Sequence, residues 1–350
     1  MTECGKDEVF RKGDCPVMKY AGYILKTIAA GLTGLIILSV LTCFYSLTPM
    51  HVPNKNQITD FVWPSDSYWV SLTEGIAWGK FDGDGFNNNR TISSPEILFM
   101  GSSHLEAQNV FRERNACSLL EKEFNGRYPV YNLGISGHNL FKVCHYVPRV
   151  LDHYRKKPPA FLLIETATID VSDKMADDIL HDRYRYKAVK VGRGVKFLMR
   201  LPFIRFLYLR WKKGLKTIFI PGARSNSVVG EAETSTANAC DRLLRHLADT
   251  AAKHGVKIII CYHPREVLRT DGSLSFIGNG SAGLFAEAAA RHGVTFIDMS
   301  SAFRDMFRRE HHVPHGFING KLGRGHLNRY GHEAIARELA AAIRGLNGVK

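Results

Sequence analysis

Short apolar stretches alternate with longer amphipathic ones along residues 96–346. The apolar stretches are three to six residues long and lie at 97–100, 130–132, 161–164, 256–261 and 294–297. They show no regular polar alternation, which is typical of strands that are buried on both faces of a parallel sheet. The pattern therefore predicts an α/β domain, in which one parallel sheet lies between two layers of helices.

Helices are predicted between these strands, because the apolar residues there recur with the period of a helix. In the last helix, Arg329–Leu346, the side chains of Ile335, Leu339 and Ile343 share one face. The other predicted helices end near Phe124 and Tyr154, or span 231–254 and 282–292. Ligands of such folds bind at the carboxyl ends of the strands, so chemistry is expected in the turns that follow them.

Residues 27–47, Thr27 to Leu47, form a run of 21 residues without a charge. A helix of this length crosses a hydrocarbon core of about 30 Å, and a soluble helix rarely stays apolar on every face for so long. A cleaved signal peptide fits poorly, because the run is long and no A-x-A site follows it. The sequence therefore predicts a transmembrane anchor at 27–47.

Basic residues are concentrated before this anchor. Five precede it (Lys6, Arg11, Lys12, Lys19 and Lys26), whereas Lys55 is the only basic residue in the next 25 or so. The positive-inside rule then makes residues 1–26 a cytoplasmic tail and puts the remainder outside. We therefore predict a single-pass protein of the bacterial inner membrane, with its domain in the periplasm. Residues 48–95, rich in aromatic residues and turn formers, are predicted to be an extracytoplasmic linker.

The net charge of +14 is local. No acidic residue lies between Asp182 and Glu231, a stretch with 13 Lys and Arg, whereas the rest of the chain has 34 basic and 33 acidic residues. Residues 172–230 are therefore predicted to be a basic amphipathic insertion in the 96–346 domain. Phe, Leu, Trp and Tyr alternate there with the basic residues. On an exported domain this composition argues against nucleic acid and favours a membrane surface, contacted through 183–216, or a membrane partner.

The exported part has four cysteines, Cys117, Cys144, Cys240 and Cys261. Disulfides can form outside the cytoplasm, but buried free thiols are the preferred interpretation of such scattered positions. No C-x-x-C pair occurs, so no zinc or redox site of that type is predicted.

Three segments carry chemistry-bearing residues at the expected places. Ser103 follows the first strand in ILFMGSSHLEAQ, Gly134 follows the second in VYNLGISGHN, and His326 precedes the last helix in GHLNRYGHEAIA. A serine hydroxyl becomes a good nucleophile when an imidazole takes its proton, and the resulting oxyanion needs N–H donors. Taken alone, Ser103 could equally be a helix N-cap.

In this order, and over residues 95–345 without the insertion, the three segments resemble the SGNH (GDSL-like) hydrolase family. The resemblance implies that Ser103 is the nucleophile, that Gly134 donates its N–H to the oxyanion, and that His326 is the general base. It implies no cofactor and no metal. Ser136 lacks the G-x-S-x-G frame of an α/β-hydrolase nucleophile.

The sequence departs from that family at two places. The family's acid stands three residues before the histidine, where this chain has Gly323, and the family's oxyanion asparagine is missing from the block 165–170. Thr168 is the candidate that replaces the asparagine. Glu165, Asp298 or a backbone carbonyl are the candidates that orient the imidazole of His326.

Other histidines follow the same strands. His104, His138 and His263 are candidates for the rim of the cleft, or ordinary polar residues there. His311, His312 and His315 form a cluster in the sequence, but no cysteine or carboxylate spacing supports a metal site.

The resemblance implies an enzyme that transfers an O-acyl group, such as acetyl, to a cell-envelope or secreted polysaccharide, or removes it. The substrates are then a polysaccharide and an acyl donor. Membrane-anchored SGNH-like proteins that this chain resembles often work beside a multi-span acyltransferase, so such a protein or another membrane subunit is the expected partner. The alternative is a catalytically weakened SGNH-like subunit that binds glycan or scaffolds a membrane complex. The missing acid and asparagine favour this alternative, and the retained serine and histidine favour the enzyme.

Overall fold

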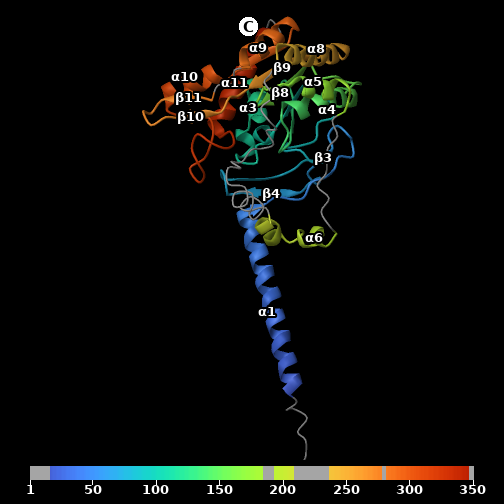
Figure 1. The fold of residues 1–350 in the computed structure, drawn as a ribbon, viewed down its shortest axis with the longest axis vertical. Coiled ribbons are helices and arrows are strands. Elements are labelled where there is room, and N and C mark those ends of the chain that lie inside the picture. Colours follow the sequence, from blue (N-terminus) through green and yellow to red (C-terminus); the bar gives the residue numbers. More distant parts are fainter. Residues whose placement is uncertain (1–15, 184–192, 209–235, 278–280, 347–350) are drawn as a thin grey trace, which may run out of the picture. The chain divides into compact units, whose positions relative to one another are not determined.

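The computed structural model of the protein describes residues 16–183, 193–208, 236–277 and 281–346. These residues form two compact units (Figure 1). One unit holds the described residues up to Phe44 together with 193–208, and the other holds the remaining described residues. The predicted anchor up to Phe44 and part of the basic insertion therefore belong to one unit, and the α/β domain is the other.

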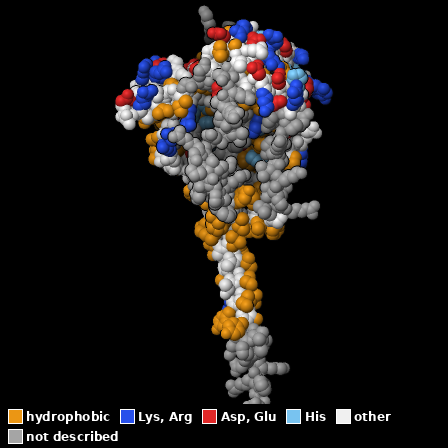
Figure 2. Space-filling model, viewed as in Figure 1, with side chains coloured by type: hydrophobic (Ala, Val, Ile, Leu, Met, Phe, Trp, Pro, Cys, Tyr) orange, Lys and Arg blue, Asp and Glu red, His pale blue; other side chains and the backbone are white. Residues whose placement is uncertain are grey.

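Helix α1, Pro16–Tyr45, dominates the first unit. Its residues Tyr20–Tyr45 are long and apolar enough to cross a membrane. Most of their large apolar side chains are exposed, as the orange surface along α1 shows in Figure 2. The helix begins before the predicted anchor, because lysine is a good helix former and Lys19 and Lys26 do not interrupt it. Their charges end the apolar run, but they do not end the helix. The same unit contains helix α6, Arg193–Leu198, and helical residues at 202–208.

The second unit is built on the predicted parallel sheet. Its strands are β6 Ile97–Gly101, β7 Val130–Gly134, β8 Phe161–Thr166, β9 Lys257–Tyr262 and β12 Thr295–Asp298. They pair in the order β12-β9-β8-β6-β7, and every pair is parallel. After β6 the chain goes first to one neighbour, β7, and then to the other, β8. The strand order therefore reverses direction at β6, and ligands of open α/β sheets bind beyond the carboxyl ends of the strands at such a point.

Successive strand residues point to opposite faces of the sheet, and each face is covered by helices. Leu98, Leu162 and Ile258 pack with helices α4 Leu140–His153, α5 Asp173–Leu180, α8 Ala237–Lys253 and α9 Ala282–Arg291. Ile97, Phe161 and Ile259 pack with α3 Ala116–Glu123, α10 Ser300–Glu310 and α11 Arg329–Leu346. The predicted three-layer α/β fold is confirmed.

The segment 48–95 is not a linker, and this part of the predicted domain organisation is wrong. It contains the short antiparallel strands β2 Val52–Pro53, β3 Phe61–Val62, β4 Tyr68–Ser71 and β5 Ala77–Lys80, with β1 Ser46–Leu47 pairing to β4. Ile58, Val62 and Phe86 join the core of the α/β domain. Trp69 and Phe81 are also buried. The aromatic residues of this segment therefore cover the domain instead of connecting it to the anchor.

The insertion also begins later than residue 172. Helix α5 buries Ala176 and Ile179 in the core of the domain, between α4 and α8. Much of the remaining insertion, at 184–192 and 209–235, lies outside the described residues. A hairpin of β10 Glu266–Leu268 and β11 Leu274–Phe276, which the sequence pattern did not indicate, follows β9. Cys117, Cys144, Cys240 and Cys261 are buried free thiols, as preferred from the sequence.

Candidate active site

Ser103 lies in a tight turn between the first strand of the sheet and a short helix. Strand β6 ends at Gly101, and helix α2, Ser103–Glu106, begins two residues later. Ser102, and not Ser103, is the N-cap, because its hydroxyl accepts the N–H of His104 at 3.2 Å. A Cβ atom at position 101 would lie 2.4 Å from Oε2 of Glu165, so the turn needs glycine there. Ser103 is therefore free of the capping role that the sequence left open for it.

The imidazole of His326 meets the hydroxyl of Ser103. Nε2 of His326 lies 2.9 Å from Oγ of Ser103, within the hydrogen-bond reach that a nucleophile and its base require. Nδ1 lies 2.9 Å from Oε2 of Glu74, and the backbone N–H of His326 donates to Oε1 of the same carboxylate at 2.7 Å. An ionised carboxylate only accepts hydrogen bonds, so Nδ1 carries the ring proton and Nε2 presents its lone pair to Ser103.

The fold holds Glu74 in this position from several sides. Glu74 lies in the turn between β4 and β5, and its carbonyl accepts the side-chain amide of Asn109 at 2.7 Å. The side chain of Asn319 bridges the same turn by accepting from the N–H of Gly75 and donating to its carbonyl. A Cβ atom at Gly325 would lie 2.1 Å from Oε1 of Glu74, so glycine permits the carboxylate to approach His326.

The sequence-based candidates for this acid are wrong. Glu165 points to the other side of the nucleophile turn, where it accepts from the N–H of Ser102 at 2.7 Å and contacts His263 at 2.6 Å. Asp298 is exposed and accepts from the N–H and hydroxyl of Ser300 at 2.8 and 2.5 Å. Glu74 was missed because it precedes the sheet by some twenty residues, in a segment predicted to be a linker.

The two predicted oxyanion donors are already engaged. The N–H of Gly134 donates to Oδ1 of Asn132 at 2.8 Å, and the N–H of Thr168 donates to the hydroxyl of Thr166 at 3.2 Å. A Cβ atom at Gly134 would lie 2.4 Å from the N atom of Glu106, so this glycine lets β7 pack against α2. Among the described residues, the N–H of Ser103 donates to no protein acceptor, which leaves it available to an oxyanion.

Of the three histidines predicted at the rim, only His104 lies beside the Ser103–His326 pair. Its ring centroid is 5.2 Å from that of His326, and its Nδ1 accepts the N–H of Leu327 at 3.1 Å. His138 is buried and stacks on Tyr146; burial lowers the pKa of His138 to about 3. His263 is fully buried behind the turn, so neither of these two is a rim residue.

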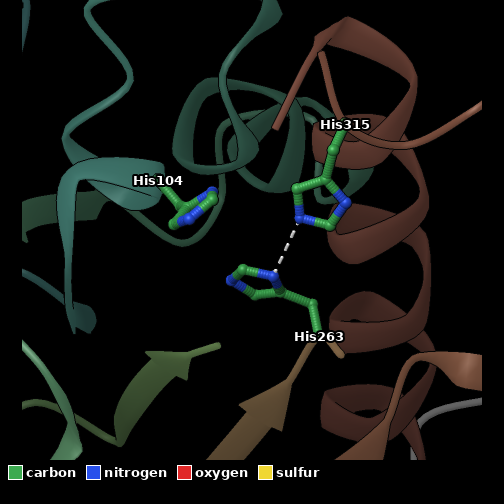
Figure 3. Close-up of side chains that lie close together, drawn as sticks. All are labelled: His104, His263 and His315. Carbon is green, nitrogen blue, oxygen red and sulfur yellow. Dashed lines mark hydrogen bonds between the residues drawn. The ribbon is translucent and has the colours of Figure 1, made fainter. Parts of the chain in front are cut away.

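The histidines that are close in sequence, His311, His312 and His315, do not gather. His312 stacks on Tyr330, and His311 is exposed. His315 instead lies against His263, with its Nε2 3.2 Å from Nδ1 of that residue. Figure 3 shows His104, His263 and His315 side by side, although they come from three separate segments of the chain.

Glu106 is a second buried carboxyl group close to the nucleophile turn. It accepts the indole N–H of Trp63 and the hydroxyl of Ser136. Burial nevertheless raises the pKa of Glu106 to about 7. The side chain is 1% exposed, so this carboxyl keeps its proton in the folded chain at mildly acidic pH.

We expect Glu106 to make the folded state less stable as the pH rises through this range. The pKa of Glu106 is about 7 in the folded state and near 4.5 when unperturbed. The contribution of this group to the free energy of unfolding is therefore complete below pH 4.5 and lost by about pH 7. The loss amounts to about 3 kcal/mol. In urea unfolding of the full chain in detergent, Glu106→Gln should remove this pH dependence, and the exposed control Glu310→Gln should keep it. Identical pH profiles for Glu106→Gln and the unmodified chain would contradict the burial argument.

No protein-family model matches this chain, and no curated protein matches it. Among solved structures, the chain is similar in fold to TesA and to acetylxylan esterases. One is TesA, at 13% identity over 71% of this chain and 98% of that one, with a TM-score of 0.39. Another is the acetyl xylan esterase AlAXEase, at 15% identity over 71% and 98%, with a TM-score of 0.41. A third is a catalytic mutant of Axe2, an acetylxylan esterase from Geobacillus stearothermophilus, at 14% identity over 72% of this chain and 95% of that one, with a TM-score of 0.35. Similarity at this level concerns the fold and not the substrate.

Proposed function

We propose that the protein is a membrane-anchored, extracytoplasmic serine enzyme that transfers an O-acyl group to a polysaccharide or hydrolyses it from one. The observation that carries this proposal is the continuous line of hydrogen bonds from Ser103 through His326 to Glu74. Nucleophile, base and orienting acid stand in the order that acyl transfer requires. About 30% of the His326 and Glu74 side chains is exposed, so a large acceptor can reach the base.

The chemistry follows from the geometry. His326 takes the proton of Ser103 as Oγ attacks the acyl carbonyl of the donor, and the N–H of Ser103 stabilises the oxyanion. The intermediate collapses to an acyl-serine, and the protonated imidazole gives its proton to the leaving alcohol. A sugar hydroxyl or a water then attacks the acyl-serine, His326 takes the proton of that nucleophile, and the proton returns to Oγ. Glu74 stabilises the imidazolium in both steps.

Chemical labelling tests the serine directly. A fluorophosphonate probe with the full chain in detergent should label Ser103, as peptide mass spectrometry would show, and a chromogenic acetyl ester should be hydrolysed. Acetyl transfer is then measured with the same donor and polysaccharide acceptors. Failure to label Ser103, with a fold that is intact by thermal unfolding, would overturn the proposal.

The second candidate function is a glycan-binding or scaffolding subunit without turnover. It is favoured by the engaged N–H groups of Gly134 and Thr168, because each oxyanion donor is worth about 10²–10³ in rate. A chain that labels at Ser103 but hydrolyses no ester and transfers no acetyl group would support this candidate.

The membrane setting is part of the same proposal. Helix α1 is the candidate span, the preceding basic residues place the N-terminus in the cytoplasm of a bacterium, and the domain then works in the periplasm. A multi-span acyltransferase or other membrane subunit that supplies the acyl donor is the expected partner. Residues 193–208, the part of the basic segment 183–216 that is described beside Arg183, share a unit with α1 and are proposed to meet lipid.

We expect residues 193–208 to be protected from hydrogen exchange by anionic lipid. The full chain should show slower exchange there in nanodiscs of phosphatidylglycerol than in nanodiscs of phosphatidylcholine, because each basic residue near an anionic surface contributes about 1 kcal/mol. Added salt should reduce the difference. Replacing Arg193, Lys196, Arg200 and Arg205 by Gln should abolish it. Equal exchange in the two lipids would show that this segment does not bind the membrane surface.

A further inference from the structure

Two carboxylate–imidazole pairs face each other behind the nucleophile turn. In the first, Nε2 of His263 contacts Oε1 of Glu165 at 2.6 Å. In the second, Nδ1 of His315 lies against Oε2 of Glu266, whose other oxygen accepts the backbone N–H of His315 at 2.9 Å. All four side chains are nearly fully buried. The free edges of the two rings meet at 3.2 Å, as the dashed line in Figure 3 shows.

This arrangement turns two lone pairs toward each other. An ionised carboxylate accepts hydrogen bonds and donates none, so Nε2 of His263 carries the ring proton toward Glu165, and the ion-pair contact with Glu266 favours the ring proton on Nδ1 of His315. The inner nitrogens, Nδ1 of His263 and Nε2 of His315, are then both acceptors. Two acceptors at 3.2 Å repel each other unless a positively charged particle lies between them. That particle is a shared proton or a metal cation.

Charge and distance favour the metal cation. Glu165 and Glu266 bring two negative charges into the interior, and no Lys or Arg in the described ranges pairs with either of them. A shared proton would leave one charge uncompensated, whereas a divalent cation compensates both. Two nitrogens that bind one zinc ion tetrahedrally at 2.0–2.1 Å lie about 3.3–3.4 Å apart. A carboxylate behind each imidazole is also how zinc-binding histidines are oriented.

A third imidazole is in reach. His104 has a nitrogen within 4.8 Å of the ligand nitrogens of the other two rings. Its Nδ1 accepts the N–H of Leu327, so His104 can bind through Nε2 only when it gives up that hydrogen bond and moves its proton to Nδ1. His104 is therefore the weaker ligand. It is also partly exposed, whereas His263 and His315 are buried.

We propose that His263, His315 and, as a weaker third ligand, His104 bind one divalent cation of the zinc class. Imidazole nitrogen selects zinc, cobalt or nickel over magnesium or calcium. Three protein ligands leave a fourth position for water. Glu165 also holds the N–H of Ser102, so the ion stabilises the nucleophile turn from behind. The three ligands form no sequence motif, because His104 comes after β6, His263 after β9 and His315 after helix α10.

The first experiment uses the unmodified full chain, purified in detergent without chelator. Elemental analysis should find about one zinc per chain. After removal of the metal, Co²⁺ should produce the intense visible absorption of a tetrahedral nitrogen site, and Zn²⁺ should abolish it. Added Zn²⁺ should raise the unfolding temperature of the stripped protein by roughly 5–10 °C at a hundredfold excess over its dissociation constant. A stripped chain that binds neither ion saturably would overturn the proposal in favour of the shared proton.

Variants then assign the ligands. His263→Ala and His315→Ala should each lose stoichiometric metal, His104→Ala should bind it more weakly, and the exposed control His153→Ala should retain it fully. If either buried variant fails to fold, the Co²⁺ spectrum of the unmodified chain still decides the proposal. Retention of full zinc binding by folded His263→Ala would exclude this site. These readouts do not depend on the function proposed for Ser103.

Discussion

Ser103→Ala is expected to reduce kcat for acyl transfer or hydrolysis by about 10⁴–10⁶ while leaving the fold unchanged. In the proposed mechanism Oγ of Ser103 forms the covalent intermediate, and it lies 2.9 Å from Nε2 of His326. Ala keeps the helix start at residue 103, because the capping hydroxyl belongs to Ser102. The measurement is ester hydrolysis with the full chain in detergent, and thermal unfolding checks the fold.

The exposed Ser301→Ala is the matched control for this change, and it should keep full activity and full labelling by the fluorophosphonate probe. If Ser103→Ala retains more than about a tenth of the activity, the reaction does not pass through an acyl-serine at this position. If Ser103→Ala loses activity but unfolds at the same temperature as the unmodified chain, the hydroxyl has a chemical role and not a structural one.

Much of the α/β fold could be predicted because its strands are buried on both faces. Stretches such as Phe161–Ile164 are continuous apolar runs, and the helices between them keep a clear period. The three motifs were also predictable, since each directly follows or precedes one of these elements. The structure brings Ser103 and His326, the two residues that the resemblance singles out, within 2.9 Å of each other.

Residues brought into the site by tertiary contacts could not be predicted in the same way. Glu74 reaches His326 from a hairpin turn 252 residues away in the sequence, and nothing around it marks it as an acid of the site. Short antiparallel strands such as β4 and β5 carry weak periodicity, so the whole 48–95 segment reads as a linker until its packing is seen. The acid predicted from proximity, Glu165, serves the nucleophile turn instead.

Gly134 shows a different reason for failure. A glycine after the second strand fits the family pattern, and the resemblance implies that its backbone N–H donates a hydrogen bond to the oxyanion. The structure shows a packing role, because β7 and α2 approach so closely there that a side chain would clash with the backbone of Glu106. Its N–H is turned to Asn132. A motif therefore identified the correct turn without identifying the atom that would donate.

The second large effect is expected for Glu74→Gln, which should reduce kcat by about 10³–10⁴ with little change in KM. The carboxylate accepts two hydrogen bonds from His326, one from the backbone N–H and one from Nδ1. The backbone N–H cannot reverse its direction, so it fixes the oxygen of the glutamine amide on itself. The amide NH₂ then faces Nδ1, which must become an acceptor. The ring proton moves to Nε2, and His326 can no longer take the proton of Ser103.

Asp298→Asn is the control for this prediction, because Asp298 is an acid at the edge of the same sheet that contacts Ser300 and not His326. It should leave kcat unchanged. The pH profile of kcat gives a readout that a merely structural role would not move. Raising the pH should not restore the activity of Glu74→Gln, because the defect is the tautomer of a neutral imidazole and not its protonation. A loss of less than tenfold for Glu74→Gln, or an equal loss for Asp298→Asn, would show that the imidazole of His326 is oriented by another group.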